Sequence, residues 1–289
     1  MADDFRHVYA EVEGVRLHWA ELGAPSALPP VVLLHGLADS HLTWRPIAAA
    51  LAADRRVLMP DLAGSGLSER PDASYALAWH AHLIAAWLAQ LDLEAVDIVG
   101  HSYGGGVAQM LLLECPARIH RLGLAASGGL GRELNFWLKF AAFPYFVEHH
   151  GQPFMAFGTR RARAREARDD QSRADVEALV QMNSTPGTAR AFSRTVRDVI
   201  SLRGQERIAH DRLGEIAALP PMAVLWGEDD AHIPIAHGHA MVERLEGVRF
   251  RAFAGCKHYL HHDDPTGFAE EVRAFLDDPN PAPVRPRGR

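Results

Sequence analysis

Short apolar runs that alternate with helical segments constrain the fold of this chain more than any other feature. Runs of this kind are typical of strands that are buried on both faces of a parallel sheet. They lie at 29–36, 55–66, 95–102, 118–127, 222–230 and 248–255. Helical patterns lie at about 43–53, 75–91, 107–116, 236–245 and 266–276. The alternation predicts a parallel sheet with helices on both faces.

The N-terminal segment adds two strands to this sheet. Residues 6–22 alternate between apolar and polar side chains on either side of Glu13-Gly14, which predicts a hairpin. The 289-residue chain is long enough for one large domain with an insertion. We therefore expect an α/β fold with a mostly parallel, eight-stranded, doubly wound sheet.

The alternation stops between 128 and 213, where no clear buried strand is found. This block begins with many aromatic residues and continues with a charged, helix-prone stretch. We expect it to be a helical cap inserted into a core formed by 1–127 and 214–278. Residues 279–289 are polar and rich in proline, which predicts a flexible tail.

Composition excludes several classes of protein. Lysine and arginine number 30 against 36 acidic residues, a net charge of −6, so nothing indicates nucleic-acid binding. The two cysteines, Cys115 and Cys256, are too far apart in sequence to suggest a zinc site or a disulfide framework. No apolar run reaches the ~18 residues of a membrane span. The N-terminus is acidic and lacks a signal-like apolar stretch, so we expect a soluble cytoplasmic protein, either monomeric or homodimeric.

The stretch IVGHSYGGG, residues 98–106, places one serine between glycines where a strand gives way to a helix. This is the G-x-S-x-G pattern of a nucleophile elbow. Gly100 and Gly104 would remove side chains that collide in so sharp a turn, and Gly105 and Gly106 would let the helix approach the sheet. The turn would expose the Ser102 hydroxyl beside the positive end of a helix.

The chain resembles the α/β-hydrolase superfamily over nearly its whole length. The resemblance is carried by LHGLADS, PDLAGSGLSERP, GHSYGG, WGEDDAHIP and GCKHYLHHDDP, in this order. It implies a catalytic triad in the chain order Ser102, Asp230, His258. It also gives a loop-shaping role to Asp61 and a structural role to the histidines of LHG and GHS, His35 and His101.

Within this triad, His258 would act as the base that takes the Ser102 proton, because a serine hydroxyl is a poor nucleophile at neutral pH. Asp230 would orient His258 and stabilise its charged form. The alternatives are His261 and His262 for the base, and Asp229 and Glu133 for the carboxylate.

The resemblance also implies an oxyanion hole made of the backbone N–H groups of Leu37 and Tyr103. It implies no metal and no organic cofactor. The His237-x-His239 pair does not alter this expectation, because side chains two residues apart on a helix diverge.

The aromatic residues admit two interpretations. Those of the cap could form its own core, or they could line a substrate pocket above Ser102, with Trp44 and Leu37 beneath. A pocket of this kind would take a hydrophobic small molecule. The pocket candidates are Trp44, Phe136, Trp137, Phe140, Phe143, Phe154 and Phe157. The arginine-rich stretch 160–173 is interpreted as a solvated helix face, with contact to an anionic substrate as the alternative.

We therefore expect a serine hydrolase, most simply a carboxylic ester hydrolase, that cleaves an ester-like bond of a hydrophobic small molecule through an acyl-enzyme. Serine at the elbow argues against the dehalogenases and epoxide hydrolases of this superfamily, which carry aspartate there. The alternatives are a carbon–carbon bond hydrolase acting on a diketone-type metabolite, a cofactor-free lyase, acyltransferase or perhydrolase, and a hydrolase-like ligand receptor. Many carbon–carbon hydrolases carry tryptophan at the position of Tyr259.

Overall fold

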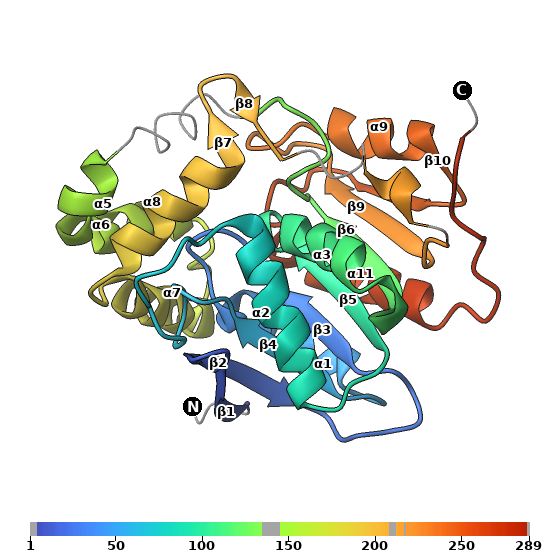
Figure 1. The fold of residues 1–289 in the computed structure, drawn as a ribbon, viewed down its shortest axis with the longest axis horizontal. Coiled ribbons are helices and arrows are strands. Elements are labelled where there is room, and N and C mark those ends of the chain that lie inside the picture. Colours follow the sequence, from blue (N-terminus) through green and yellow to red (C-terminus); the bar gives the residue numbers. More distant parts are fainter. Residues whose placement is uncertain (1–4, 135–144, 208–211, 217, 288–289) are drawn as a thin grey trace.

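The computed structural model describes residues 5–134, 145–207, 212–216 and 218–287. Its centre is an eight-stranded sheet in the order β1-β2-β4-β3-β5-β6-β9-β11 (Figure 1). β1 runs antiparallel to β2 and β2 antiparallel to β4, while every other neighbouring pair is parallel. The strands are β1 Arg6–Val12, β2 Val15–Leu22, β3 Val31–Leu34, β4 Val57–Asp61, β5 Val96–His101, β6 Ile119–Ala125, β9 Met222–Gly227 and β11 Arg249–Phe253. The predicted fold class is confirmed.

The central strands form where the sequence predicts them, because their residues are mostly apolar on both faces. All four residues of β3 are fully buried, and so is nearly all of β4, β5 and β9. The predicted hairpin turn is also present. Glu13 and Gly14 both have positive φ, 50° and 75°, which matches the twist that a two-residue hairpin needs.

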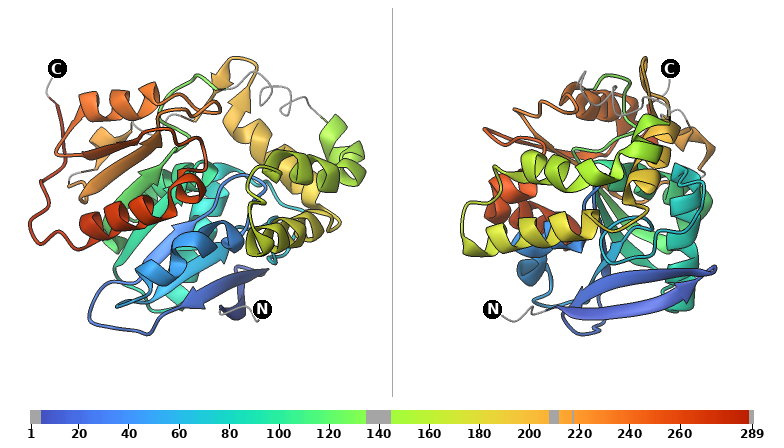
Figure 2. Two further views of the ribbon diagram at one scale, coloured as in Figure 1. Left: turned by 180° about the vertical axis from the view of Figure 1, so that it is seen from behind. Right: turned by 90° about the vertical axis from the view of Figure 1, so that its left-hand side faces the viewer.

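Helices cover both faces of the sheet. α2 Leu77–Gln90 packs against α3 Tyr103–Glu114, and α1 Arg45–Leu51 packs against α11 Pro265–Leu276. Seen from behind, α1 and α11 lie in front of the sheet (Figure 2). α9 Ala236–Arg244 contacts β9 and β11. Short elements complete the core: η1 His41–Trp44, η2 Pro116–Arg118, η5 Leu213–Glu215 and α10 Leu260–Asp263.

A helical block lies between β6 and β9 in sequence and to one side of the sheet (Figure 1). It contains α5 Phe146–His150, η3 Gln152–Phe154, α6 Met155–Arg163, α7 Asp170–Asn183 and α8 Thr188–Val199. α6 packs on α7, and α5 packs on α8. A small hairpin, β7 Ile200–Ser201 with β8 Gly204–Gln205, follows α8. We call this block the cap; its limits at 128 and 213 stay a prediction.

The C-terminal segment differs from the free tail that its composition predicts. β12 Arg285–Pro286 pairs antiparallel with β10 Leu245–Glu246, and Val284 is buried. The chain passes close to Gly247, where a Cβ atom would lie 2.3 Å from the Pro283 carbonyl oxygen. An apolar side chain and a strand pairing thus hold part of this segment. Separately, none of the helices in the described ranges is long and apolar enough to cross a membrane.

Candidate active site

Ser102 stands alone between β5, which ends at His101, and α3, which begins at Tyr103. Its backbone has φ 53° and ψ −118°, a conformation that costs free energy for a residue with a side chain. Glycines make this turn possible. A Cβ atom on Gly100 would lie 2.5 Å from the Gly104 carbonyl oxygen, and one on Gly104 would lie 2.2 Å from the Leu34 carbonyl oxygen.

The two following glycines differ from each other. A Cβ atom on Gly105 would lie 2.1 Å from Ser127 Oγ, so this glycine lets α3 approach the end of β6. On Gly106 the nearest neighbour, a methyl group of Leu77, would lie 3.4 Å away, which is an ordinary contact. The expectation that both allow close packing is therefore correct for Gly105 and wrong for Gly106.

The structure brings Ser102, His258 and Asp230 together, although they come from three distant parts of the chain. His258 Nε2 lies 3.0 Å from Ser102 Oγ, and His258 Nδ1 lies 2.8 Å from Asp230 Oδ2. The other carboxylate oxygen of Asp230 accepts the backbone N–H groups of His232 and Ile233 at 2.8 and 3.1 Å. Asp230 is thus held in place and can orient the imidazole so that Nε2 accepts the serine proton.

The alternative residues lie in other surroundings. Glu133 is largely exposed and accepts a hydrogen bond from His237 Nε2 at 2.8 Å. Asp229 is exposed on the same loop as Asp230. His261 is fully buried, with Nε2 3.0 Å from Thr43 Oγ1, and His262 reaches the same hydroxyl at 3.2 Å. None of these four side chains has a described hydrogen bond to Ser102 or His258.

Two other histidines support the loops. His101 Nε2 donates to the His258 carbonyl oxygen at 2.9 Å, and burial, reinforced by His258, holds the pKa of His101 well below its usual value. His101 is therefore a neutral structural group. His35 Nδ1 donates to the Gly36 carbonyl, and its Nε2 accepts the Leu62 N–H at 3.0 Å, which ties two loops together.

Leu37 and Tyr103 border the same cavity as Ser102 and His258. Within the described residues, neither of their backbone N–H groups donates a hydrogen bond to the protein. Tyr103 is the first residue of α3, where backbone N–H groups have no partner within the helix. Their role as an oxyanion hole stays a prediction, with which this lack of a described protein partner is compatible.

The cavity at Ser102 has a volume of about 220 Å³. Its apolar wall comes from Leu37, Leu77, Leu134, Ala162, Val199, Ile200 and Ile233. Among the described residues, aliphatic side chains thus form most of this wall, and Tyr103 and Tyr259 also border the cavity. Of these residues, Ile233 could have been predicted from the sequence to line the cavity, because it lies in the same loop as Asp230.

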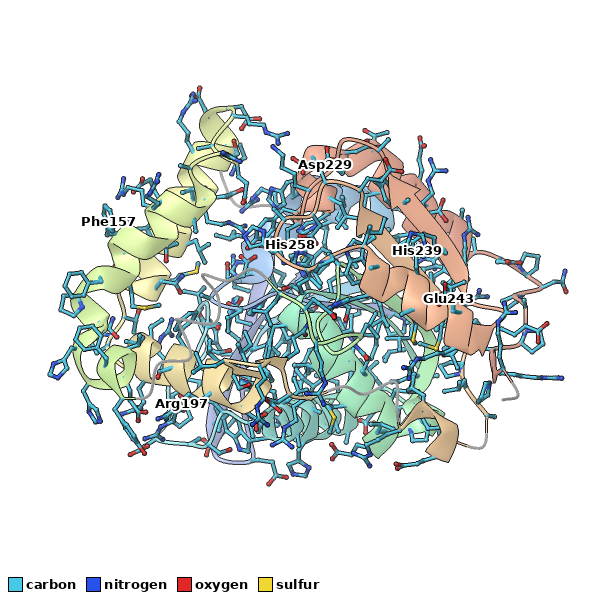
Figure 3. All side chains as sticks on the ribbon, turned by 90° about the horizontal axis from the view of Figure 1, so that it is seen from above. Phe157, Arg197, Asp229, His239, Glu243 and His258 are labelled. Carbon is cyan, nitrogen blue, oxygen red and sulfur yellow. The ribbon has the colours of Figure 1, made fainter. Side chains whose placement is uncertain are left out.

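Three of the aromatic pocket candidates are contradicted. Trp44 is fully buried and packs on His261, with ring centres 4.8 Å apart, rather than lining the cavity. Phe154 and Phe157 are 63% and 69% exposed. Figure 3 shows Phe157 at the outer edge of the cap, away from His258. Phe157 and Ala162 are about 140° apart around α6, so they face different sides. Phe136, Trp137, Phe140 and Phe143 lie outside the described residues.

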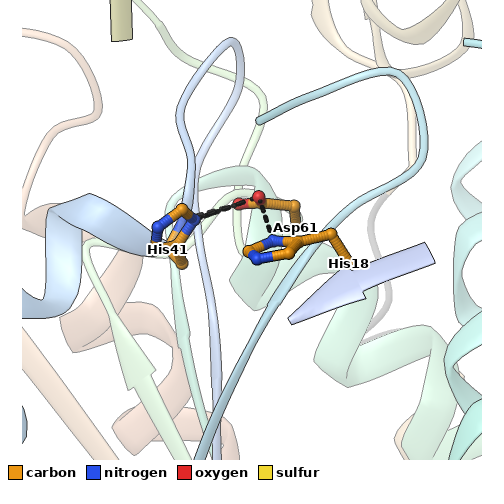
Figure 4. Close-up of side chains that lie close together, drawn as sticks. All are labelled: His18, His41 and Asp61. Carbon is orange, nitrogen blue, oxygen red and sulfur yellow. Dashed lines mark hydrogen bonds and ion pairs between the residues drawn. The ribbon is translucent and has the colours of Figure 1, made fainter. Parts of the chain in front are cut away.

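Among the described residues, two groups of side chains have the composition of metal ligands: Asp230 with His232 and His258, and His18 with His41 and Asp61. The first contains two members of the proposed triad, Asp230 and His258. In the second, Asp61 accepts hydrogen bonds from His18 Nδ1 at 2.7 Å and from His41 Nδ1 at 3.0 Å (Figure 4). It also accepts the backbone N–H groups of His41 and Leu67. Hydrogen bonds therefore account for this arrangement.

Comparison with known proteins agrees with the fold described above. Residues 29–265 match the alpha/beta hydrolase fold family. The chain belongs to this family. An uncharacterized protein of Mycobacterium tuberculosis is 32% identical over 270 residues, covering 88% of this chain and 77% of that protein.

Two characterised relatives of this α/β-hydrolase differ in chemistry. A 2-hydroxy-6-oxo-2,4-heptadienoate hydrolase of Pseudomonas putida is 28% identical over 206 residues, covering 69% of each chain. The crystal structure of the esterase RhEst1 from Rhodococcus sp. ECU1013 superposes with a TM-score of 0.74 at 25% identity, covering 96% of this chain and 100% of that one.

Proposed function

We propose that this α/β-hydrolase is a serine hydrolase that cleaves ester-like bonds of hydrophobic small molecules. The observation that carries the proposal is the Ser102–His258–Asp230 chain of hydrogen bonds, 3.0 and 2.8 Å long, beside an apolar cavity. Ser102 attacks the carbonyl carbon while His258 Nε2 takes the hydroxyl proton. The oxyanion is bound by the N–H groups of Leu37 and Tyr103.

The second half of the reaction reuses the same groups. His258 gives its proton to the leaving alcohol, and the acyl group stays on Ser102 as an ester. Water then loses a proton to His258 and attacks the acyl carbon. The acid leaves, and the proton returns to Ser102. Asp230 stays ionised throughout and holds the imidazole in one orientation.

A second candidate is hydrolysis of a carbon–carbon bond next to a ketone. Similarity to the heptadienoate hydrolase favours it, because that relative matches 69% of this chain. Tyr259 argues against it, because the family resemblance implies tryptophan at this position in many carbon–carbon hydrolases. The two candidates share the triad and differ in the bond that is broken.

Hydrolysis of p-nitrophenyl esters from acetate to decanoate tests the proposal. We expect turnover with an optimum at short or medium chains, because a cavity of about 220 Å³ holds only a small acyl group. A vinylogous 1,5-diketone acid, tested beside the esters, addresses the second candidate. Turnover of the diketone with folded protein inactive on every ester would reverse the order of the two proposals.

The chain-length optimum should depend on the aliphatic wall and not on the cap phenylalanines. Val199→Phe, which fills part of the cavity, should lower kcat/KM for the longest accepted ester by roughly 10-fold or more while acetate is affected less. Phe157→Ala is the matched control and should leave the profile unchanged, because Phe157 points to solvent. A profile that responds to Phe157 and not to Val199 would contradict this account of the pocket.

A further inference from the structure

One arginine of the cap turns into the protein. The stretch 160–173 was expected to be a solvated helix face, and Arg160, Arg161 and Arg165 are indeed exposed. The side chain of Arg163 is only 7% exposed. A buried guanidinium costs free energy unless charged or polar groups pair with it, so its partners are informative.

Arg163 has three close partners at the place where the cap meets the core. Its Nη1 lies 3.1 Å from Asp39 Oδ2, and its Nε lies 2.8 Å from Glu166 Oε2. The guanidinium carbon lies 4.1 Å above the ring centre of Tyr259, within the range of a cation–π contact. The Asp39 and Glu166 side chains are only 2% and 9% exposed.

Two of these partners belong to the loops of the active site. Asp39 is two residues beyond Leu37, and its Oδ1 accepts the Ser40 N–H at 2.9 Å, which anchors the carboxylate in that turn. Tyr259 follows His258 and borders the Ser102 cavity. A single side chain of the cap therefore contacts the turn of the expected oxyanion hole and the loop of the expected base.

The charges around Arg163 do not balance when both carboxylates are ionised. Two buried carboxylates then share one guanidinium, and the second is poorly compensated. Burial raises the pKa of Glu166 to about 7, an effect that Asp39 and Asp263 reinforce and that Arg163 and Arg168 oppose. Glu166 therefore gains or loses its proton near neutral pH.

The groups that face Glu166 come from several elements. They are Asp39, Arg163, Arg168, Tyr259, His262 and Asp263. His262 Nδ1 lies 3.9 Å from Glu166 Oε2, and burial lowers the pKa of His262 to about 4, so this imidazole is neutral when Glu166 titrates. A separate ion pair joins Arg45 and Asp175, with Arg45 Nε 2.9 Å from Asp175 Oδ2.

A second cavity, of about 190 Å³, gives this cluster contact with solvent. It is bordered by Asp39, Thr43, Arg163, Glu166 and His262, among others, and it does not include Ser102. A proton can therefore reach Glu166 without passing through the proposed catalytic cavity.

We propose that Arg163 is a positioning residue, which holds the Leu37–Asp39 turn and the His258–Tyr259 loop together beneath the cap while Glu166 is protonated. The proposal rests on the proposed hydrolysis. For an acid whose pKa is raised by burial, ionisation costs free energy as the pH rises above the ordinary value of 4.5, and the full cost is reached above about 7. The closed cluster should therefore weaken as the pH rises from about 4.5 to about 7 and change little above that.

Substitution of Arg163 tests the positioning role. Arg163→Met should lower kcat for the best ester by roughly 10- to 100-fold with a much smaller change in KM, because displaced catalytic groups slow the chemical step. Arg163→Lys keeps the charge and loses the planar fork, so its kcat should fall less. Arg161→Met, an exposed neighbour, is the control. Wild-type kcat in folded Arg163→Lys and Arg163→Met would overturn the proposal; if the methionine variant does not fold, the lysine variant decides.

The pH profile tests the part played by Glu166. The kcat of the wild type relative to that of Glu166→Gln, which cannot ionise, should decline as the pH rises toward about 7 and level off above it. A ratio that does not change with pH would overturn the inference about the proton. Labelling of Ser102 by a fluorophosphonate distinguishes a failure of the proposed function from a failure of the positioning role of Arg163. Wild-type protein that is neither labelled nor active on esters refutes the proposed function and this inference with it, whereas labelling at equal rates in wild type and Arg163→Met refutes the positioning role alone.

Discussion

Ser102→Ala should lower kcat/KM for the best p-nitrophenyl ester by at least about 10⁴-fold, equivalent to roughly 5.5 kcal/mol of transition-state stabilisation. The substitution removes the hydroxyl oxygen that forms the acyl-enzyme bond in the proposed mechanism, and it leaves the cavity, the backbone N–H groups of Leu37 and Tyr103, and the His258–Asp230 pair in place. Any residual rate would come from binding and from the oxyanion site.

The folded state of Ser102→Ala should be nearly as stable as the wild type. Alanine keeps the Cβ atom, so the backbone strain at φ 53° is unchanged, and only the hydrogen bond between Ser102 Oγ and His258 Nε2 is lost. Thermal unfolding measured beside the ester assay checks this point. Ester turnover that survives in a well-folded Ser102→Ala protein would rule out the serine mechanism and leave the fold assignment untouched.

The parts of the fold that the sequence predicted are those with local signals. β3 and β9 are apolar throughout because both of their faces are buried. The nucleophile elbow could also be predicted from the sequence, because the sharp turn requires glycine at Gly100 and Gly104. The residues of the proposed triad could be named because the resemblance to the α/β-hydrolase superfamily implies them, and each follows a strand that ends at the same edge of the sheet.

The pocket and the cap interface were not predictable in the same way. α6 carries Phe157 toward solvent and Arg163 toward the core, the reverse of what hydrophobicity predicts for a helix face. The inward arginine is stabilised by Asp39 and Tyr259, which are more than 90 residues away in sequence. Trp44 likewise packs on His261, at the other end of the chain. Such pairings depend on the tertiary arrangement, which leaves no periodic trace in the sequence.

Asp61→Asn should be the most destabilising single substitution proposed for this chain, lowering the free energy of unfolding by about 3–5 kcal/mol at pH 7. The Asp61 side chain is fully buried and accepts hydrogen bonds from the Nδ1 atoms of His18 and His41 and from the N–H groups of His41 and Leu67. An amide has only one acceptor oxygen, so at least one buried donor would face an NH₂ group. Asp72→Asn, in an exposed ion pair with Arg194, is the control and should change stability little.

The loss of stability in Asp61→Asn should depend on pH, whereas the loss caused by a packing defect alone would not. Burial alone would raise the pKa of Asp61, but His41 and His18 hold it well below the ordinary value of 3.8. The ionised carboxylate therefore stabilises the folded state fully above the unfolded-state pKa, and this contribution is lost as the pH falls from there toward the lower folded-state pKa. The stability gap between wild type and Asp61→Asn should narrow by about 1 kcal/mol between pH 7 and pH 3. Urea unfolding of both proteins at pH 7, 5, 4 and 3 measures it; a gap that stays constant or widens toward acid would mean that Asp61 acts through its shape and not through its charge.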